Sequence, residues 1–497
     1  MLTPTCGLAA LLSAIIPPMK STLAQFAALV LIALFGVSPA LATCGGGGGG
    51  GVGGLSDGGA TYQVPWHPRQ RTDPPIKAGL VVYWFPATVE EVQKSSLRSS
   101  RLLTLYASQC VSMEIVDYEN SPEKVLLGDA KVPVALLATH DGKVINKAEN
   151  KDGRLKVENV EKLVTTEVKE RESAVDSTLK EAKDKAKAGD NAAAAKLFRS
   201  ILEHQCLFPK KAKEATKELK KLGEAVAEFN FDSPVFDKLD SARIEQTMNR
   251  GLMAEVRAQY TLAEKLYTRA HLMDPADPVP LRYLGELYRH HTGEWDKART
   301  TFDSILNMPA DRLSRAVALH GLGKMTIHDG EFKKGLALME DSIAEFPLAL
   351  TYRNLAVYWN SEGDPVKGNA YTKQALALDP KDPYNLVFAA VFMAAAGQQE
   401  EALKIAQQNA RLLPASYNLA AVYAQSGQRD KALAFLRRHF FQYERYQAVR
   451  EKEMMEARVD AVFDSIRQDP DFMALTSGAD GKLPMPMKAI SAPTTDR

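Results

Sequence analysis

The chain has little cysteine and almost no net charge. Its 497 residues include only Cys6, Cys44, Cys110 and Cys206, and the formal net charge is +1. A multi-disulfide scaffold is therefore excluded, no C-x-x-C pair exists, and no cysteine–histidine cluster has zinc-ligand spacing. The sequence leaves open whether Cys110 and Cys206 pair. Proteins that bind nucleic acid or an anionic membrane surface usually carry an excess of positive charge, which this chain lacks. No nucleic-acid partner is therefore expected.

The sequence also lacks the common catalytic motifs. It has no phosphate-binding loop with its lysine, no nucleophile elbow and no zinc-protease helix. The seven glycines at 45–51 lack the strand, lysine and helix that a phosphate loop needs. The His290/His291 and His320/His328 pairs have no carboxylate or cysteine at ligand spacing on one helix face, so we expect no metal. These absences predict a protein that is not an enzyme and has no cofactor.

The N-terminus carries an export signal. Lys20, an apolar run over 23–37 and the small residues of 40–42 are typical of a secretory signal peptide, which we place at 1–43 with an upstream extension. The natural start is Met1 or Met19. Cleavage after residue 42 would leave Cys44 as a free thiol, whereas the segment 41–44 resembles a bacterial lipobox, apart from Thr43, and would make Cys44 the lipidation site. The Gly/Pro-rich residues 44–75 predict a tether, and proline at 65, 68, 74 and 75 predicts an extended linker.

A small α/β domain is predicted over 76–170. The apolar run 80–85 predicts a buried strand, followed by a helical stretch to Tyr106 and by strands at 113–116 and 132–138. Asp141-Gly142 predicts a tight turn into a strand at 143–146, and a helix over 160–168 closes the domain.

This pattern resembles the thioredoxin fold. Trp84 ends the first strand, Asp117 ends the second, Val132-Pro133 matches the family's X–cis-Pro, and the 141–144 hairpin follows. Where the family has C-x-x-C, this chain has residues 85–91 without cysteine, so thiol–disulfide exchange is not expected. Cys110 is interpreted as a small buried hydrophobic residue. If Pro133 is cis, the resemblance implies a loop that holds extended peptides in related domains.

Internal repeats of 34 residues dominate the second half of the chain. The unit from 349 has large and small residues at fixed offsets, the next begins 34 residues later, and six good units cover about 244–441. These units resemble tetratricopeptide (TPR) repeats. The positions that carry the resemblance in the best unit are Tyr352, Leu355, Ala356, Trp359, Gly363, Gly368, Ala375 and Pro380. Other helical-hairpin repeats and an irregular bundle are the alternatives.

The predicted fold class is α+β multidomain: a thioredoxin-like α/β domain followed by an all-α TPR superhelical solenoid. A Lys/Glu-rich helical connector with a degenerate repeat is expected at 171–243, a capping helix at 442–475 and a disordered tail at 476–497.

A partner is expected on the first helix of each hairpin, at positions that packing does not use. The resemblance to TPR arrays implies a peptide-binding groove there. The candidates are Tyr283, Glu286, His290, Lys324, His328, Arg353, Asn354, Asn360, Asn418 and Gln425. Some TPR domains grip a terminal carboxylate with cations on flanking helices. Those cations are missing beside Asn354 and Asn418, so such capture is not predicted.

The sequence favours a non-catalytic scaffold or adaptor that binds other proteins or peptides in the bacterial cell envelope, either periplasmic or lipid-anchored to the membrane. The alternatives are a thioredoxin-fold enzyme and a substrate-holding periplasmic chaperone.

Overall fold

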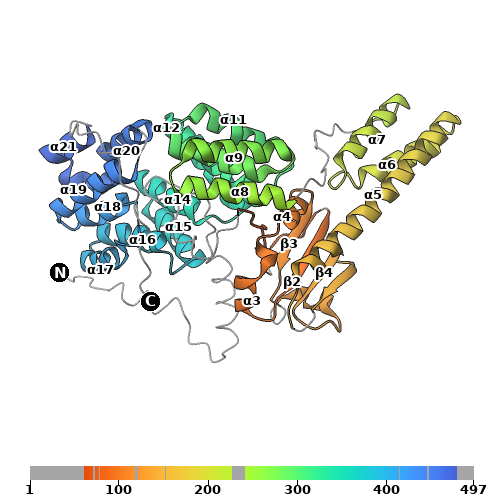
Figure 1. Ribbon diagram of the computed structural model, residues 1–497, viewed down its shortest axis with the longest axis horizontal. Coiled ribbons are helices and arrows are strands. Elements are labelled where there is room, and N and C mark those ends of the chain that lie inside the picture. The colour runs from red at the N-terminus through yellow and green to blue at the C-terminus, as the bar shows by residue number, and fades with distance from the viewer. Residues whose placement is uncertain are drawn as a thin grey trace, which may run out of the picture.

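The computed structural model describes residues 61–477 apart from 71–72, 78, 118–120, 151–152, 227–240, 414 and 445–446. The expected signal peptide, Cys44, most of the tether and all but the start of the tail lie outside the described residues. A sheet domain with a helical arm lies at one end, and an array of helices continues to the other (Figure 1). No helix of the described ranges combines the length and the apolar character needed to cross a bilayer.

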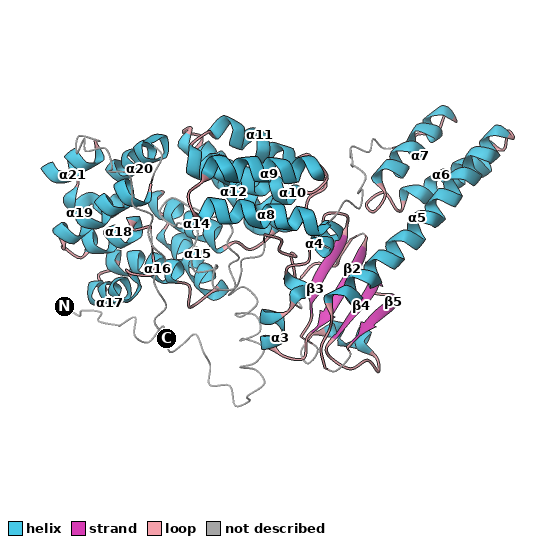
Figure 2. Cartoon of the chain, viewed as in Figure 1, coloured by secondary structure: helices cyan, strands magenta, loops and turns pink. Residues whose placement is uncertain are grey.

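The sheet has five strands in the order β1-β3-β2-β4-β5. β2 runs parallel to β3 and antiparallel to β4, and β4 and β5 form an antiparallel hairpin. The four predicted strands are confirmed, with shifted ends. The bounds are β1 His67–Pro68, β2 Leu80–Phe85, β3 Val111–Ile115, β4 Val134–Thr139 and β5 Val144–Glu149. Among the residues that the structure describes, strands occur only in this domain (Figure 2).

Residues 61–70 differ from the expected linker. Their β1 pairs in parallel with β3, and Tyr62, Val64 and Trp66 are buried. The proline count indicated an extended linker, but the apolar side chains around Pro65 pack onto the protein.

Both faces of the sheet are covered, as the apolar run of β2 requires. Leu80, Val82 and Trp84 face a core that also receives side chains from the helices after β2 and β5. The alternate residues Val81, Tyr83 and Phe85 face a second cluster. A 3₁₀ helix at Pro122–Leu127 contributes Leu126 and Leu127 to that cluster.

The single helix expected after β2 is divided into three short elements. α3 spans Val89–Lys94, the 3₁₀ helix η2 spans Ser96–Arg98 and α4 spans Arg101–Ala107. The hydroxyls of Ser95 and Ser100 accept backbone N–H groups of Leu97 and Leu103. Because a serine in extended backbone starts a new helix more readily than it continues one, these two caps explain the division.

A helical arm follows the sheet. It consists of α5 Val157–Lys187, α6 Asn191–Leu202 and α7 Pro209–Lys221. α5 begins against β4 and β5 and continues without a break through residue 170, where the domain boundary was expected. Cys110 forms a disulfide with Cys206, between α6 and α7, with a Cα–Cα distance of 5.7 Å. Interpreting Cys110 as a simple hydrophobic residue was therefore wrong, because its partner is 96 residues away in sequence.

The array is built from helical hairpins in which each pair packs on the next. Glycines with positive φ, such as Gly363 and Gly397, close the turns because a left-handed residue ends a helix without a Cβ clash. The helices are α8 Ser241–Val256, α9 Tyr260–Met273, α10 Pro278–Glu286, α11 Trp295–Leu306, α12 Arg312–His328, α13 Phe332–Glu345, α14 Ala349–Ser361, α15 Pro365–Leu378, α16 Pro383–Ala395, α17 Gln399–Asn409, α18 Tyr417–Gln425 and α19 Arg429–Arg438.

The helices cross closely where small residues face large ones. A Cβ at Gly285 or at Gly321 would overlap the ring of Phe302, which is fully buried. Phe302 lies on the second helix of one hairpin, and the glycines lie on the first helices of this hairpin and the next. The small–large pattern read from the sequence is thus the contact that stacks the hairpins.

Two π-helical segments and a terminal group complete the array. η4 Leu287–Thr292 extends α10, and η5 His439–Tyr443 extends α19. The expected cap contains α20 Gln447–Val459, the 3₁₀ helix η6 Ala461–Ile466 and α21 Pro470–Thr476.

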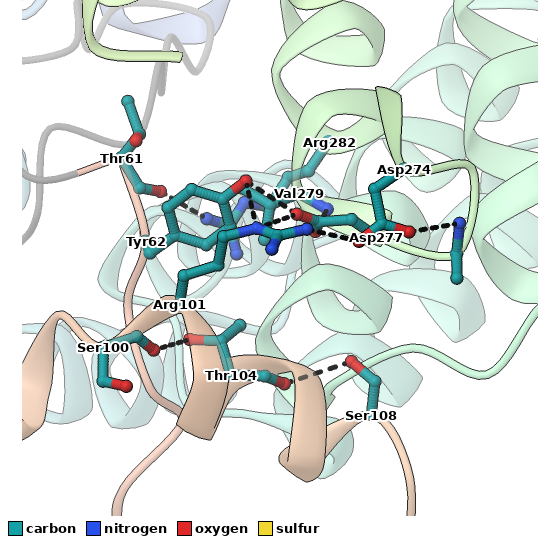
Figure 3. Close-up of polar contacts among 11 residues, drawn as sticks. Thr61, Tyr62, Ser100, Arg101, Thr104, Ser108, Asp274, Asp277, Val279 and Arg282 are labelled. Carbon is teal, nitrogen blue, oxygen red and sulfur yellow. Dashed lines mark hydrogen bonds and ion pairs between the residues drawn. The ribbon is translucent and has the colours of Figure 1, made fainter. Parts of the chain in front are cut away.

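A buried ion cluster joins the sheet domain to the array, and we call it the junction (Figure 3). Arg101, at the start of α4, donates to Asp277 at 3.1 Å and also to Asp274, both at the turn before α10. The Tyr62 hydroxyl donates to Asp277 at 2.6 Å. Arg101 and Asp277 are 2% and 0% exposed, so this contact is sealed from water.

Candidate functional site

The ten candidate residues lie on the first helices α10 with η4, α12, α14 and α18, as the repeat register predicts. Their exposure is lower than expected. Asn360 is exposed, and His328, Asn418 and Gln425 are half-buried. The buried candidates are Tyr283, Glu286, His290, Lys324, Arg353 and Asn354.

Several buried candidates hold the array together. Arg353 donates to the Asn385 side chain of α16 at 2.5 Å, and Asn354 donates to the carbonyl of Leu350 one turn earlier. Gln425 of α18 donates to the carbonyl of Val391 on α16 at 3.2 Å. Arg353 and Gln425 join neighbouring first helices and Asn354 bonds within its own helix, so all three make packing contacts and are not free groups.

Glu286 and Tyr283 are also satisfied inside the array. Both carboxylate oxygens of Glu286 accept from Arg289, at 3.1 and 2.8 Å. The ring of Tyr283 lies 5.1 Å from that of Tyr267, and burial raises the pKa of Tyr283 to about 12. Neither residue offers a ready contact to a partner.

Lys324 and His328 form a different arrangement, because they bind a carboxylate from the far end of the array. The Glu456 carboxylate of α20 lies 3.2 Å from Lys324 Nζ and 2.6 Å from His328 Nε2. The Lys324 ammonium also lies 5.4 Å from the centre of the Tyr358 ring on α14, within cation–π range. The rings of Trp295 and His328 form an edge-to-face pair, with centroids 5.3 Å apart. We call this three-residue contact the Glu456 site.

The electrostatics of the Glu456 site favour the charged pair. Burial acts to raise the pKa of Glu456, but Lys324 and His328 outweigh it and hold that pKa well below its ordinary value. Burial likewise acts to lower the pKa of Lys324, but Glu456 outweighs it and raises that pKa. Both groups are therefore ionised at neutral pH, and each stabilises the other's charge.

His290 lies beside a second acidic residue of the C-terminal segment. Its Nε2 is 3.6 Å from a carboxyl oxygen of Glu444. Burial, with His291 and Arg289 nearby, lowers the pKa of His290 well below its usual value. Burial and the Glu453 charge raise the pKa of Glu444 well above its usual value. Both shifts favour the uncharged forms of the two groups.

The C-terminal segment supplies carboxyl groups along one side of α20. Glu453 lies 2.9 Å from His439 Nε2, and Asp460, just after α20, accepts from the Tyr417 hydroxyl at 3.0 Å. Glu453 and Glu456 are three residues apart on α20, and Asp460 follows the helix as the N-cap of η6. We call Glu453, Glu456 and Asp460 the acidic stripe.

The side of the array near Glu456 is rich in bases. We call this surface the basic face. It consists of Arg289, His290, His320, Lys324, His328 and Arg353. Sequence reasoning selected four of these six but missed the acidic stripe. Two sequence features could have indicated this contact. They are the excess of basic residues among the candidates and the carboxylates at helical spacing in the expected cap.

Two polar atoms of the basic face are not satisfied by α20. His290 Nε2 and His320 Nε2 are buried and have no hydrogen-bond partner among the described residues. His320 Nδ1 lies 3.1 Å from the Thr351 hydroxyl, which fixes that ring. The described residues contain no group of three or more metal-ligating side chains that could hold an ion.

The sheet domain separates its disulfide from the segment that carries cysteines in thioredoxins. The Val132-Pro133 peptide is cis, as the resemblance implied, and Pro133 precedes β4 at the end of β2 that carries Phe85. Cys110 adjoins the opposite end, where Leu80 pairs with Val111. At about 3.3 Å per residue, the length of β2 is roughly 17 Å, so Cys110 is remote from the 85–91 segment.

Comparisons with known proteins give partial likenesses. No family model matches the chain. The protein CTR9 homolog of Arabidopsis thaliana is 25% identical over an alignment of 232 residues, which covers 37% of this chain. This chain spans about a fifth of that relative's length, 21%.

Two solved structures resemble parts of the chain. A thermophilic TPR protein from Thermus thermophilus is 21% identical with a TM-score of 0.30, covering 37% of this chain and 98% of that one. The PilF protein of Pseudomonas aeruginosa is 14% identical with a TM-score of 0.31, covering 42% and 96%. Scores this low carry no argument about the fold, which rests on the hairpins themselves. The chain has a small mixed-sheet domain followed by a TPR-like helical array.

Proposed function

We propose that the chain is an exported, non-catalytic scaffold or adaptor that holds other proteins through the first helices of its array. The observation that carries the proposal is the Glu456 site, where Lys324 and His328 bind a carboxylate from a helix 132 residues away in sequence. A surface that binds a helix of its own chain has the chemistry to bind a helix or peptide of another protein.

The non-catalytic part of the proposal is supported by the sheet domain. Thiol–disulfide exchange needs an accessible thiolate and a resolving thiol. The described cysteines are bonded to each other, at the end of β2 away from Phe85. Insulin reduction by the purified chain, surviving Cys110→Ser, would support an enzyme instead.

Site-specific crosslinking tests the proposed binding surface. A photoreactive residue at Asn360, exposed on first helix α14, should capture one partner at constant stoichiometry in cells. The same group at Lys373, exposed on second helix α15, serves as the matched control. Equal capture from both positions, or many weak clients from Asn360, would contradict a scaffold and favour a substrate-holding chaperone.

Export is supported by the signal-like segment 19–44 and by the disulfide, since disulfides persist in oxidising compartments. We propose further that Cys44 is lipidated and anchors the chain to the membrane of the bacterial envelope. Fractionation of wild type and Cys44→Ala tests this. The variant should move to the soluble periplasmic fraction, and complete retention in the membrane would contradict the anchor.

A further inference from the structure

α20 occupies the basic face in a way that differs from the packing elsewhere in the array. Met454 and Ala457 anchor the helix in the C-terminal core. Its reach to α12 is made by polar groups: the Glu456 carboxylate against Lys324 and His328. α20 also approaches η4, so it spans from the last hairpin to an early one (Figure 1).

The fit of α20 is incomplete. His290 Nε2 and His320 Nε2 remain buried without a hydrogen-bond partner among the described residues, although both lie near Lys324. Elsewhere on α20, Met455 and Val459 are 57% and 78% exposed, one turn apart. Two buried histidine nitrogens near Lys324 thus stay unpaired among the described residues, and two apolar side chains of α20 stay in water.

We propose that the basic face is a docking site for an acidic α-helix of a partner protein, and that α20 is an internal ligand that the partner displaces. The inference rests on the proposed scaffold function and names its partner chemistry. The partner helix carries a carboxylate that takes the place of Glu456 against Lys324 and His328. Charge complementarity carries the choice: the Lys324 ammonium is positive, and the Glu456 carboxylate that now covers it is negative.

Release of α20 changes what the array offers. The Lys324 ammonium, the His328 ring and the two unpaired histidine nitrogens become available together, and Met455 and Val459 can find a new apolar contact. A partner must bind the open form more tightly than the closed form to shift the balance, because equal affinity for both shifts nothing. Because a partner must displace α20 to bind, weakly acidic sequences do not bind tightly enough to open the basic face.

Binding of a defined peptide tests the inference. The probe is a fluorescein-labelled peptide of residues 444–460, measured by fluorescence anisotropy against the full chain. Wild type should bind it weakly, because α20 competes. A chain with Glu456→Lys should bind it about ten-fold more tightly, because its own α20 is repelled by Lys324 and His328. A folded Glu456→Lys chain that binds no better than wild type would overturn the proposal.

A charge swap supplies the matched control. The chain with Lys324→Glu and Glu456→Lys should lose affinity for the wild-type peptide and gain affinity for a peptide carrying Glu456→Lys. A merely structural role for Glu456 would not transfer preference between two peptides in this way. If the swapped chain keeps its preference for the wild-type peptide, the Glu456 site is not the recognition site.

Hydrogen exchange on wild type keeps the test valid if the variants fail to fold. Excess unlabelled peptide should accelerate exchange of the α20 amides, 447–459, and leave α18 unchanged. No acceleration at a peptide concentration that saturates the anisotropy signal would contradict displacement. If only the displacement of α20 is wrong, partner capture at Asn360 stays intact. If the scaffold function is wrong, that capture is lost as well.

Discussion

The junction and the Glu456 site both tie together segments far apart in sequence, yet they differ in how water reaches them. At the junction, Arg101 and Asp277 are almost fully buried. At the Glu456 site, Lys324 and His328 are 8% and 17% exposed and Glu456 is 29% exposed. A sealed ion pair is costly to open because each charge would stay uncompensated, whereas a partly wet pair opens at lower cost. The comparison suggests one permanent interface and one releasable interface.

The largest expected effect comes from breaking the junction. Arg101→Met leaves Asp277 and Asp274 buried without their cation, and we expect a loss of about 3–5 kcal/mol of unfolding free energy. Denaturant unfolding followed by circular dichroism measures it. Lys94→Ala, which removes an exposed i,i+4 ion pair with Glu90, is the control and should leave the midpoint unchanged. An unchanged midpoint for Arg101→Met would remove the contrast between the two contacts.

The Glu456 site should give a smaller coupling. Lys324→Gln and Glu456→Gln, alone and together, form a double-mutant cycle read by hydrogen exchange of the α20 amides. We expect a coupling energy of about 1–2 kcal/mol, since the two charges touch but remain partly hydrated. Additive single effects would show that the contact is incidental, and a coupling as large as the cost at the junction would make α20 a permanent lid.

Acid should affect the two contacts in opposite directions. Glu456 has a lowered pKa in the folded protein, so its contribution is present above the ordinary glutamate pKa and is lost as pH falls toward the lowered value. Burial raises the pKa of Asp277, so its contribution is present below the ordinary aspartate pKa and is lost as pH rises through the raised value. Between about pH 5 and about pH 3, exchange corrected for intrinsic rates should accelerate at α20 but not at α4.

Glu456→Gln is the control for this pH series. Burial raises the pKa of Asp460 and Glu444, which lie beside α20, so these groups oppose the effect of Glu456. Without the Glu456 carboxylate, acid should no longer loosen α20. Acid loosening that persists in Glu456→Gln would assign the effect to a group outside the Glu456 site.

The same contrast separates what the sequence predicted from what it could not. The strand at 80–85 and the stacking of Phe302 on Gly285 follow from local periodicity, and the structure confirms the strand and the small–large pattern. The Glu456 contact and the Cys110–Cys206 bond join residues 132 and 96 positions apart, where no local pattern fixes a partner. Repeat register placed Arg353 and Tyr283 on the right helices but could not show that neighbouring helices bury them.

The smallest effect on stability, and the clearest on binding, is expected at Asn360. This residue is the exposed candidate at the end of α14, so Asn360→Ala should change the unfolding free energy by less than about 0.5 kcal/mol. If α14 contributes to partner contact, the variant should still weaken capture of the partner several-fold in a quantitative pull-down. Lys373→Ala on α15 is the matched control and should leave both quantities unchanged. If Lys373→Ala weakens partner capture as much as Asn360→Ala does, the partner contact lies on the second helices, away from the basic face.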